Sequence, residues 1–133
     1  MSYLLDSNTC IQFLNRRNEA LVERLITTPD GEIFVCSVVK AELFFGSRRS
    51  RDPVRSRQVQ ESFLARYTSL PFDDRAAAEY ADIRAHLEAA GTPIGANDLL
   101  IAAIARANGL VLVTHNTAEF ARVPLLDVQD WQL

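Results

Sequence analysis

Residues 93–114, PIGANDLLIAAIARANGLVLVT, indicate a buried helix that leads directly into a buried strand. Every residue from 99 to 105 is apolar, so this helix should be covered on most of its sides. Asn108-Gly109 is a typical helix end, and the apolar run GLVLVT (109–114) has the length of a strand. A continuous apolar strand next to a helix is typical of a parallel sheet with helices on both faces.

The same alternation of helix and strand runs through the rest of the chain. Further short apolar runs occur at SYLLD (2–6), EIFVCS (32–37), TSLPF (68–72) and, more weakly, LLDV (125–128). Between them we expect two helical pieces over 9–27, a short helix over 38–46, and helices that start near residues 52 and 73. The sequence therefore predicts an α/β fold, with one domain over residues 1–133 and a five-stranded, mainly parallel sheet between helices.

Local signals predict the ends and buried faces of these helices. Ser37 is the expected N-cap of the third helix, and Gly46 is its expected end. Asp52-Pro53 should start the next helix, and Asp73 or Asp74 should cap the one after it. Two buried stripes are predicted from the helical spacing, namely Val59, Phe63, Leu64 and Tyr67, and Ala77, Tyr80, Ala81, Ile83 and Leu87.

Composition excludes several classes of protein. No apolar run approaches the roughly eighteen residues needed to cross a bilayer, and MSYLLDSNT does not resemble a secretory signal. Cys10 and Cys36 lack a metal-binding spacing, so we expect reduced core thiols and a cytoplasmic protein. A formal net charge of −3 over 133 residues argues against a general coat for nucleic acid.

The basic residues are nevertheless unevenly distributed. Thirteen of the fourteen are Arg, and five lie in GSRRSRDPVRSRQ (46–58), opposed only by Asp52: Arg48, Arg49, Arg51, Arg55 and Arg57. This Arg patch either contacts phosphates or is a solvated helix face.

Carboxylates follow the predicted strands at their carboxyl ends. Asp6 ends the first strand, Glu42 lies on the helix after the second, Asp98 begins the buried helix, and Glu119 follows Thr114 and Asn116 after the fourth strand. In parallel sheets these ends share one edge, where ligands bind. Each carboxylate alone could cap a helix, pair with Arg or face solvent.

Carboxylates gathered in one cleft repel one another unless a cation or protons join them. Mg²⁺ takes oxygen ligands together with water and substrate phosphate, so it suits such a cluster. A metal ion also offsets the repulsion between these carboxylates and a phosphodiester, and it activates a water. We therefore expect metal-dependent phosphodiester cleavage.

Four motifs together resemble the PIN-domain ribonucleases, and more narrowly the VapC toxins of bacterial VapBC toxin–antitoxin modules. They are YLLDSNT (3–9), SVVKAELFFG (37–46), GTPIGANDLLIAAIA (91–105) and LVLVTHNTAEF (110–120). The resemblance implies a five-stranded parallel sheet and an endoribonuclease that depends on Mg²⁺ or Mn²⁺. Members of the family cut structured RNA, transfer RNA in several cases, and so stop translation.

The resemblance also implies roles for individual residues. Asp6, Glu42 and Asp98 match the family's acidic positions, with Asp6 and Asp98 as the main metal ligands and Glu42 acting through water or on the nucleophile. Asn116 replaces a common Asp, and Glu119 could restore that carboxylate, so we expect one well-bound metal. Six further residues would hold the metal ligands in place or contact the substrate: Thr9, Asn97, Thr114, Arg48, Arg49 and Arg51.

Partners follow from the same resemblance. VapC-like toxins form homodimers and are silenced by a VapB-like antitoxin that binds DNA and occludes the nuclease cleft. A basic side chain of the inhibitor would suit the acidic cleft. Phe44 and Phe45 are candidates for the surface that the antitoxin covers, although at least one could belong to the core.

Two other functions are compatible with parts of the sequence. LLDSNT resembles the strand-end aspartate of haloacid-dehalogenase-like phosphatases, but Asn8 stands where their motif has a second Asp, and Lys40 is the only lysine. A non-catalytic binding module, in which Asp6 is structural, would be indifferent to divalent metal. The ribonuclease hypothesis instead predicts stabilisation by metal.

Overall fold

The sheet has five strands, all parallel, in the order β3-β2-β1-β4-β5. The computed structural model describes all residues, 1–133. The strands are short: β1 (Tyr3–Leu5), β2 (Ile33–Cys36), β3 (Thr68–Leu70), β4 (Val111–Val113) and β5 (Val128–Gln129). Leu4 of β1 aligns with Phe34 on one side and with Leu112 on the other, so β1 is the central strand. The predicted α/β class with a parallel five-stranded sheet is confirmed.

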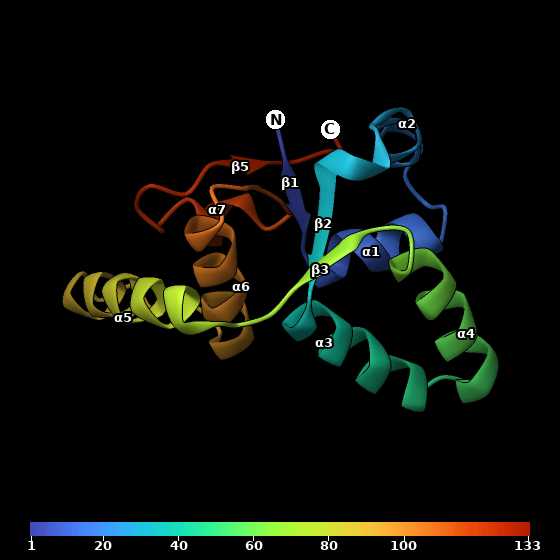
Figure 1. Ribbon diagram of the computed structural model, residues 1–133, viewed down its shortest axis with the longest axis horizontal. Helices are drawn as coiled ribbons and strands as arrows, with labels where there is room; N and C mark the ends of the chain where they lie inside the picture. Colours follow the sequence, from blue (N-terminus) through green and yellow to red (C-terminus); the bar gives the residue numbers. More distant parts are fainter.

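Seven α-helices and one 3₁₀ turn connect the strands. They are α1 (Ser7–Leu14), α2 (Glu19–Thr27), η1 (Asp30–Glu32), α3 (Ser37–Arg48), α4 (Pro53–Leu64), α5 (Asp74–Ala89), α6 (Ala96–Ala107) and α7 (Thr117–Phe120). The strands β1, β2 and β3 lie side by side in chain order across the sheet, and β4 then pairs with the other side of β1. Right-handed connections therefore put α1 to α4 on one face and α5 to α7 on the other. Figure 1 shows α5, α6 and α7 on one side of β1, and α2 and α4 on the opposite side.

The core lies between the sheet and both helical layers. The helix α6 supplies more of it than any other element, with Leu99, Ala107 and every residue of the run 101–105 buried. This agrees with the expectation of a helix covered on most sides. Cys10 and Cys36 are free thiols inside the core, as expected. No helix has both the length and the apolar character required to span a membrane.

Helix boundaries differ from the predictions at two places. The N-cap of α3 is Cys36, with φ −141° and ψ 163°, and Ser37 is already the first helical residue. The same helix continues through Gly46 to Arg48, because a glycine inside a helix costs only about 1 kcal/mol and buried Leu43 and Ser47 anchor the last turns. Asp52 and Asp73 cap α4 and α5 as predicted, each accepting a bond from the backbone N–H three residues later.

The predicted buried stripes are only partly right. Phe63 and Leu64 are buried on α4, but Val59 is 46% exposed, and buried Tyr67 lies beyond the helix end. Ala77 and Ala81 of α5 are exposed as well, since this helix packs chiefly on α6 through Ala76, Ile83 and Leu87. Tyr80 is half-buried. Both helices have one main neighbour, so their buried faces are narrower than the apolar spacing suggests.

The last strand was the least accurate prediction. The run LLDV (125–128) overlaps β5 at a single residue, Val128. Leu125 is 90% exposed and has φ 59°, a left-handed conformation that no β-strand contains. The other four strands lie inside their predicted ranges. Each observed strand is shorter than its predicted range.

Candidate active site

The acidic residues meet at the carboxyl ends of β1 and β4. These neighbouring strands form the point where the chain reverses its direction across the sheet, and such points open a crevice for ligands. Asp6 directly follows β1 and Thr114 directly follows β4. The backbone N–H of Asp6 donates to the carbonyl of Val113 at 3.1 Å, which ties the two strand ends together.

Asp6 is a nearly buried carboxylate, 6% exposed. Its Oδ1 accepts a bond from the backbone N–H of Thr9 at 2.9 Å, so it also caps α1. Burial raises the pKa of Asp6, while the hydroxyls of Thr114 and Thr9 lower it in part. Thr9 is held in turn by a 3.1 Å bond from its Oγ1 to the carbonyl of Val113. The helix-cap interpretation and the site interpretation of Asp6 are therefore both compatible with its position.

Glu42 lies on the second turn of α3 and faces the same crevice. Its Oε1 accepts a bond from the hydroxyl of Ser7, and its Oε2 accepts one from the Asn97 amide at 3.4 Å. These bonds link α3 to the first residues of α1 and α6. The charge of Glu42 contributes to the raised pKa of Asp6 and of Asp98, so the three carboxylates are near one another.

Asp98 and Glu119 form a second group at the N-terminus of α6. Burial, followed by the charges of Glu119, Glu42 and Asp6, raises the pKa of Asp98 to about 6. Glu119 has a lowered pKa, because the Asn116 amide and the backbone N–H of Gly95 donate to its carboxylate at 2.7 and 3.0 Å. The two pKa shifts are opposite in direction, so Asp98 is the carboxyl group of this pair that takes up a proton first as the pH falls.

The donor set suits a hard divalent cation. Every charge that acts on the pKa of Asp98 is a carboxylate, so a cation would relieve the repulsion. No three His, Cys, Asp or Glu side chains form a ready-made set of direct ligands. Mg²⁺ typically takes one or two carboxylates and keeps several waters, so direct bonds from Asp6 and Asp98 with a water-mediated bond from Glu42 satisfy it. The residues present therefore fit such an ion.

The Arg patch does not act as a unit. Arg57 forms an ion pair with Glu61 at 2.8 Å and stacks on the Phe44 ring at 3.5 Å. Arg49 lies 5.5 Å from the ring of Phe45, and Arg48 is exposed in the last turn of α3.

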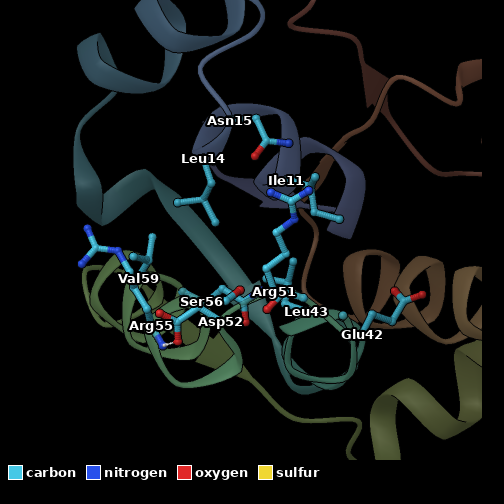
Figure 2. A pocket seen from close by; sticks show the side chains of 13 residues that line it. Ile11, Leu14, Asn15, Glu42, Leu43, Arg51, Asp52, Arg55, Ser56 and Val59 are labelled. Atoms are coloured by element: carbon cyan, nitrogen blue, oxygen red, sulfur yellow. Dashed lines mark hydrogen bonds between the residues drawn. The ribbon is translucent and has the colours of Figure 1, made fainter. Parts of the chain in front are cut away.

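Arg51 and Arg55 of the patch line a cavity that reaches Glu42 (Figure 2). Of the two phenylalanines, Phe44 is half-buried against the core, whereas Phe45 is 62% exposed.

The structure thus brings together Asp6, Thr9, Glu42, Asn97, Asp98, Thr114, Asn116 and Glu119. Nothing in it brings Arg48 or Arg49 to this crevice. Sequence reasoning missed Ser7 and Gly95, which bond to Glu42 and Glu119. Ser7 is the first residue of α1, directly after Asp6, and Gly95 is the N-cap of α6, whose first turn carries Asp98; that placement beside a candidate carboxylate was the available signal. His115 binds Asp130 at 2.9 Å instead of joining the carboxylates.

Comparison with known proteins agrees with this architecture. The PIN domain family profile matches residues 3–126. A relative named "Ribonuclease VapC2" from Haemophilus influenzae is 39% identical over 98% of both chains. A "tRNA(fMet)-specific endonuclease VapC" from Salmonella typhimurium is 37% identical over 98% of both chains. The solved structure of DNA-bound VapBC from Salmonella typhimurium superposes with a TM-score of 0.92, at 37% identity and 98% coverage of both chains. The phosphatase alternative gains no support from these matches.

Proposed function

Because this chain belongs to the PIN domain family and groups with its VapC ribonucleases, we propose that it is the toxin of a two-component toxin–antitoxin module and cleaves structured RNA in the presence of a divalent metal. The observation that carries the proposal is the group of four mutually repelling carboxylates, Asp6, Glu42, Asp98 and Glu119, at one sheet edge. A binding module without catalysis has no need of such a group, in which neighbouring carboxylates help to raise the pKa of Asp6 and Asp98.

The chain's residues would divide the work as follows. Asp6 and Asp98 would hold Mg²⁺ or Mn²⁺ directly and Glu42 through water, and the bound ion would supply Lewis-acid activation of water and neutralise phosphate charge. Thr9 and Thr114 keep the Asp6 carboxylate in place. Asn116 and the Gly95 N–H keep Glu119 ionised beside Asp98. Hydrolysis forms one phosphorus–oxygen bond to water and breaks the bond to the leaving ribose oxygen.

Three further features are parts of the proposal. The substrate would be a transfer RNA, since one relative is named for cleavage of tRNA(fMet). Cleavage of the transfer RNA would stop translation. The inhibitor would be a VapB-like antitoxin, since the superposed Salmonella structure is a VapBC complex. The toxin would form a homodimer, and exposed Phe45 is the kind of apolar side chain that an interface covers.

The test is incubation of the purified, antitoxin-free protein with total bacterial RNA, in Mg²⁺ and in EDTA. Discrete fragments are expected from the wild type with Mg²⁺ and from neither the EDTA sample nor an Asp98→Asn variant purified in the same way. Sequencing of the fragment ends would identify the RNA. Equal cleavage by the variant would contradict the proposal, and so would no cleavage by folded wild-type protein with Mg²⁺.

A further inference from the structure

A cavity of about 510 Å³ lies between α1, α3 and α4 and has Glu42 on its rim. Its apolar wall comes from all three helices, through Leu14 of α1, Leu43 of α3 and Val59 of α4. Ile11 and Val59 are 42% and 46% exposed there, so the wall is open to solvent. The volume is in the range of pockets that hold small organic groups. The cavity therefore extends from the acidic crevice along a second face of α3.

One polar group in this cavity lacks a partner. Gln60 of α4 lines it and is only 9% exposed, and its Oε1 is buried without any hydrogen bond. Buried side-chain oxygens nearly always have a partner, so each exception calls for an explanation. The oxygen is closed off from the cavity, so the Gln60 amide would have to turn toward the cavity for a ligand N–H group to provide the missing bond.

The cationic side chains of the cavity are also unengaged. Arg51 and Arg55 form no ion pair in the structure, and the nearby Asp52 carboxylate is occupied by the backbone N–H of Arg55 at 3.1 Å. Figure 2 shows Arg51 extending from the α3–α4 connection toward Ile11, with Glu42 at one end of the group and Arg55 at the other. A ligand in the cavity would therefore meet the Arg51 side chain beside Ile11, and Arg55 at the end away from Glu42.

We propose that this cavity binds one unstacked nucleotide of a single-stranded RNA segment, next to the phosphate that the acidic crevice holds. Arg51 contacts the nucleotide's phosphate, the apolar wall packs on its base, and the Gln60 amide turns toward the cavity and accepts a hydrogen bond from the base edge. Arg guanidinium groups suit phosphates, and the splayed-out bases of unpaired RNA are recognised through hydrogen bonds to their edges. This inference rests on the proposed function, because it assumes that the crevice acts on RNA.

Binding is measured by fluorescence anisotropy in Mg²⁺, on an Asp98→Asn background that does not cleave. The probe is a labelled single-stranded RNA of about ten nucleotides, a length within the site sizes of single-strand binders. Arg51→Gln should raise Kd about tenfold at low salt and reduce the slope of log K against log salt by about 0.7, the loss of one phosphate contact. The matched control is Arg57→Gln, since Arg57 belongs to the same patch but is paired with Glu61 outside the cavity. This control should stay within about twofold of the Asp98→Asn parent.

Gln60→Leu separates recognition from folding. The change removes an unbonded carbonyl, so Tm should be unchanged or higher, while Kd should rise about tenfold through loss of the base contact. In the cleavage-competent protein, Arg51→Gln and Gln60→Leu should raise KM and leave kcat unchanged, as expected for loss of uniform binding.

Unchanged Kd and KM in both variants would overturn the inference and leave the cavity to another occupant, such as a protein inhibitor. A lower Tm for Gln60→Leu would also overturn it, because the amide would then be engaged within the fold. Failure of the proposed function would look different. The wild type would not cleave in Mg²⁺, whereas the anisotropy titration would still decide whether the cavity binds RNA.

Discussion

Replacing Asp98 with asparagine should stabilise the metal-free protein while removing its activity. Asp98 has a pKa raised from the ordinary 3.8 to about 6. Its ionisation at neutral pH therefore lowers the free energy of unfolding. The amide of the variant would keep the shape of the side chain and a donor to Glu119, without the charge. The variant should therefore be more stable than the wild type at pH 7.5 in EDTA.

The sign and size follow from the raised pKa. A carboxyl whose pKa is higher in the folded state contributes stability that is complete below 3.8 and is lost as the pH rises through about 6. At about 1.4 kcal/mol per pH unit, the full shift is worth about 3 kcal/mol. Asp98 is only half-buried, and solvent screening reduces this to on the order of 1 kcal/mol. For a protein of this size that is a Tm difference of roughly 3–5 °C.

The assay is urea unfolding of both proteins in EDTA at pH 4 and pH 7.5. The stability advantage of Asp98→Asn should be about 1 kcal/mol larger at pH 7.5 than at pH 4. Asp127→Asn is the control, because the exposed Asp127 side chain makes no hydrogen bond or ion pair, and its difference from wild type should not change with pH. Saturating Mg²⁺ should reverse the order by stabilising only the wild type. An advantage that is absent or independent of pH would refute the argument from repulsion.

Three further outcomes can be checked on single variants. Asn116→Asp should lower the Tm in EDTA, because it replaces the amide that donates to Glu119 with a second negative charge. The same variant should bind Mn²⁺ more tightly, which is measured as a larger metal-induced rise in Tm. Unchanged Tm values with and without metal would place Asn116 outside the site. Thr9→Val removes a buried hydroxyl bond and should cost about 1–2 kcal/mol in urea unfolding. Arg106→Ala should cost about 3 kcal/mol, since this nearly buried guanidinium pairs with two carboxylates, and a loss below about 1 kcal/mol would show the network to be only a surface feature.

Much of the fold could be predicted because strands and helices differ in length and period. The segment between Gly95 and Asn108 is longer than most strands, and its run 99–105 is apolar on all sides; it is the buried helix α6. The gathering of Asp6, Glu42, Asp98 and Glu119 could also be predicted, since parallel strands direct their following residues to one edge.

The errors concern quantities that no local pattern contains. Ala77 and Ala81 are apolar in type, but small enough to cost little when exposed, so spacing alone could not reveal that α5 has one main neighbour. The two-residue strand β5 is set by its pairing with Leu112 and Val113, not by its own residues. The cavity at Gln60 depends on the relative placement of three helices, which is a tertiary property.

The strand order has a consequence for how the protein is made. The central strand β1 is the first to be synthesised, and it can pair with β2 once about a quarter of the chain exists. Its other neighbour, β4, and the residues Asp98 and Glu119 are translated much later. A nascent chain therefore carries Asp6 beside an unfilled edge until β4 has been made. The ribosome that makes this protein is not exposed to a finished acidic site until Glu119 has left the exit tunnel.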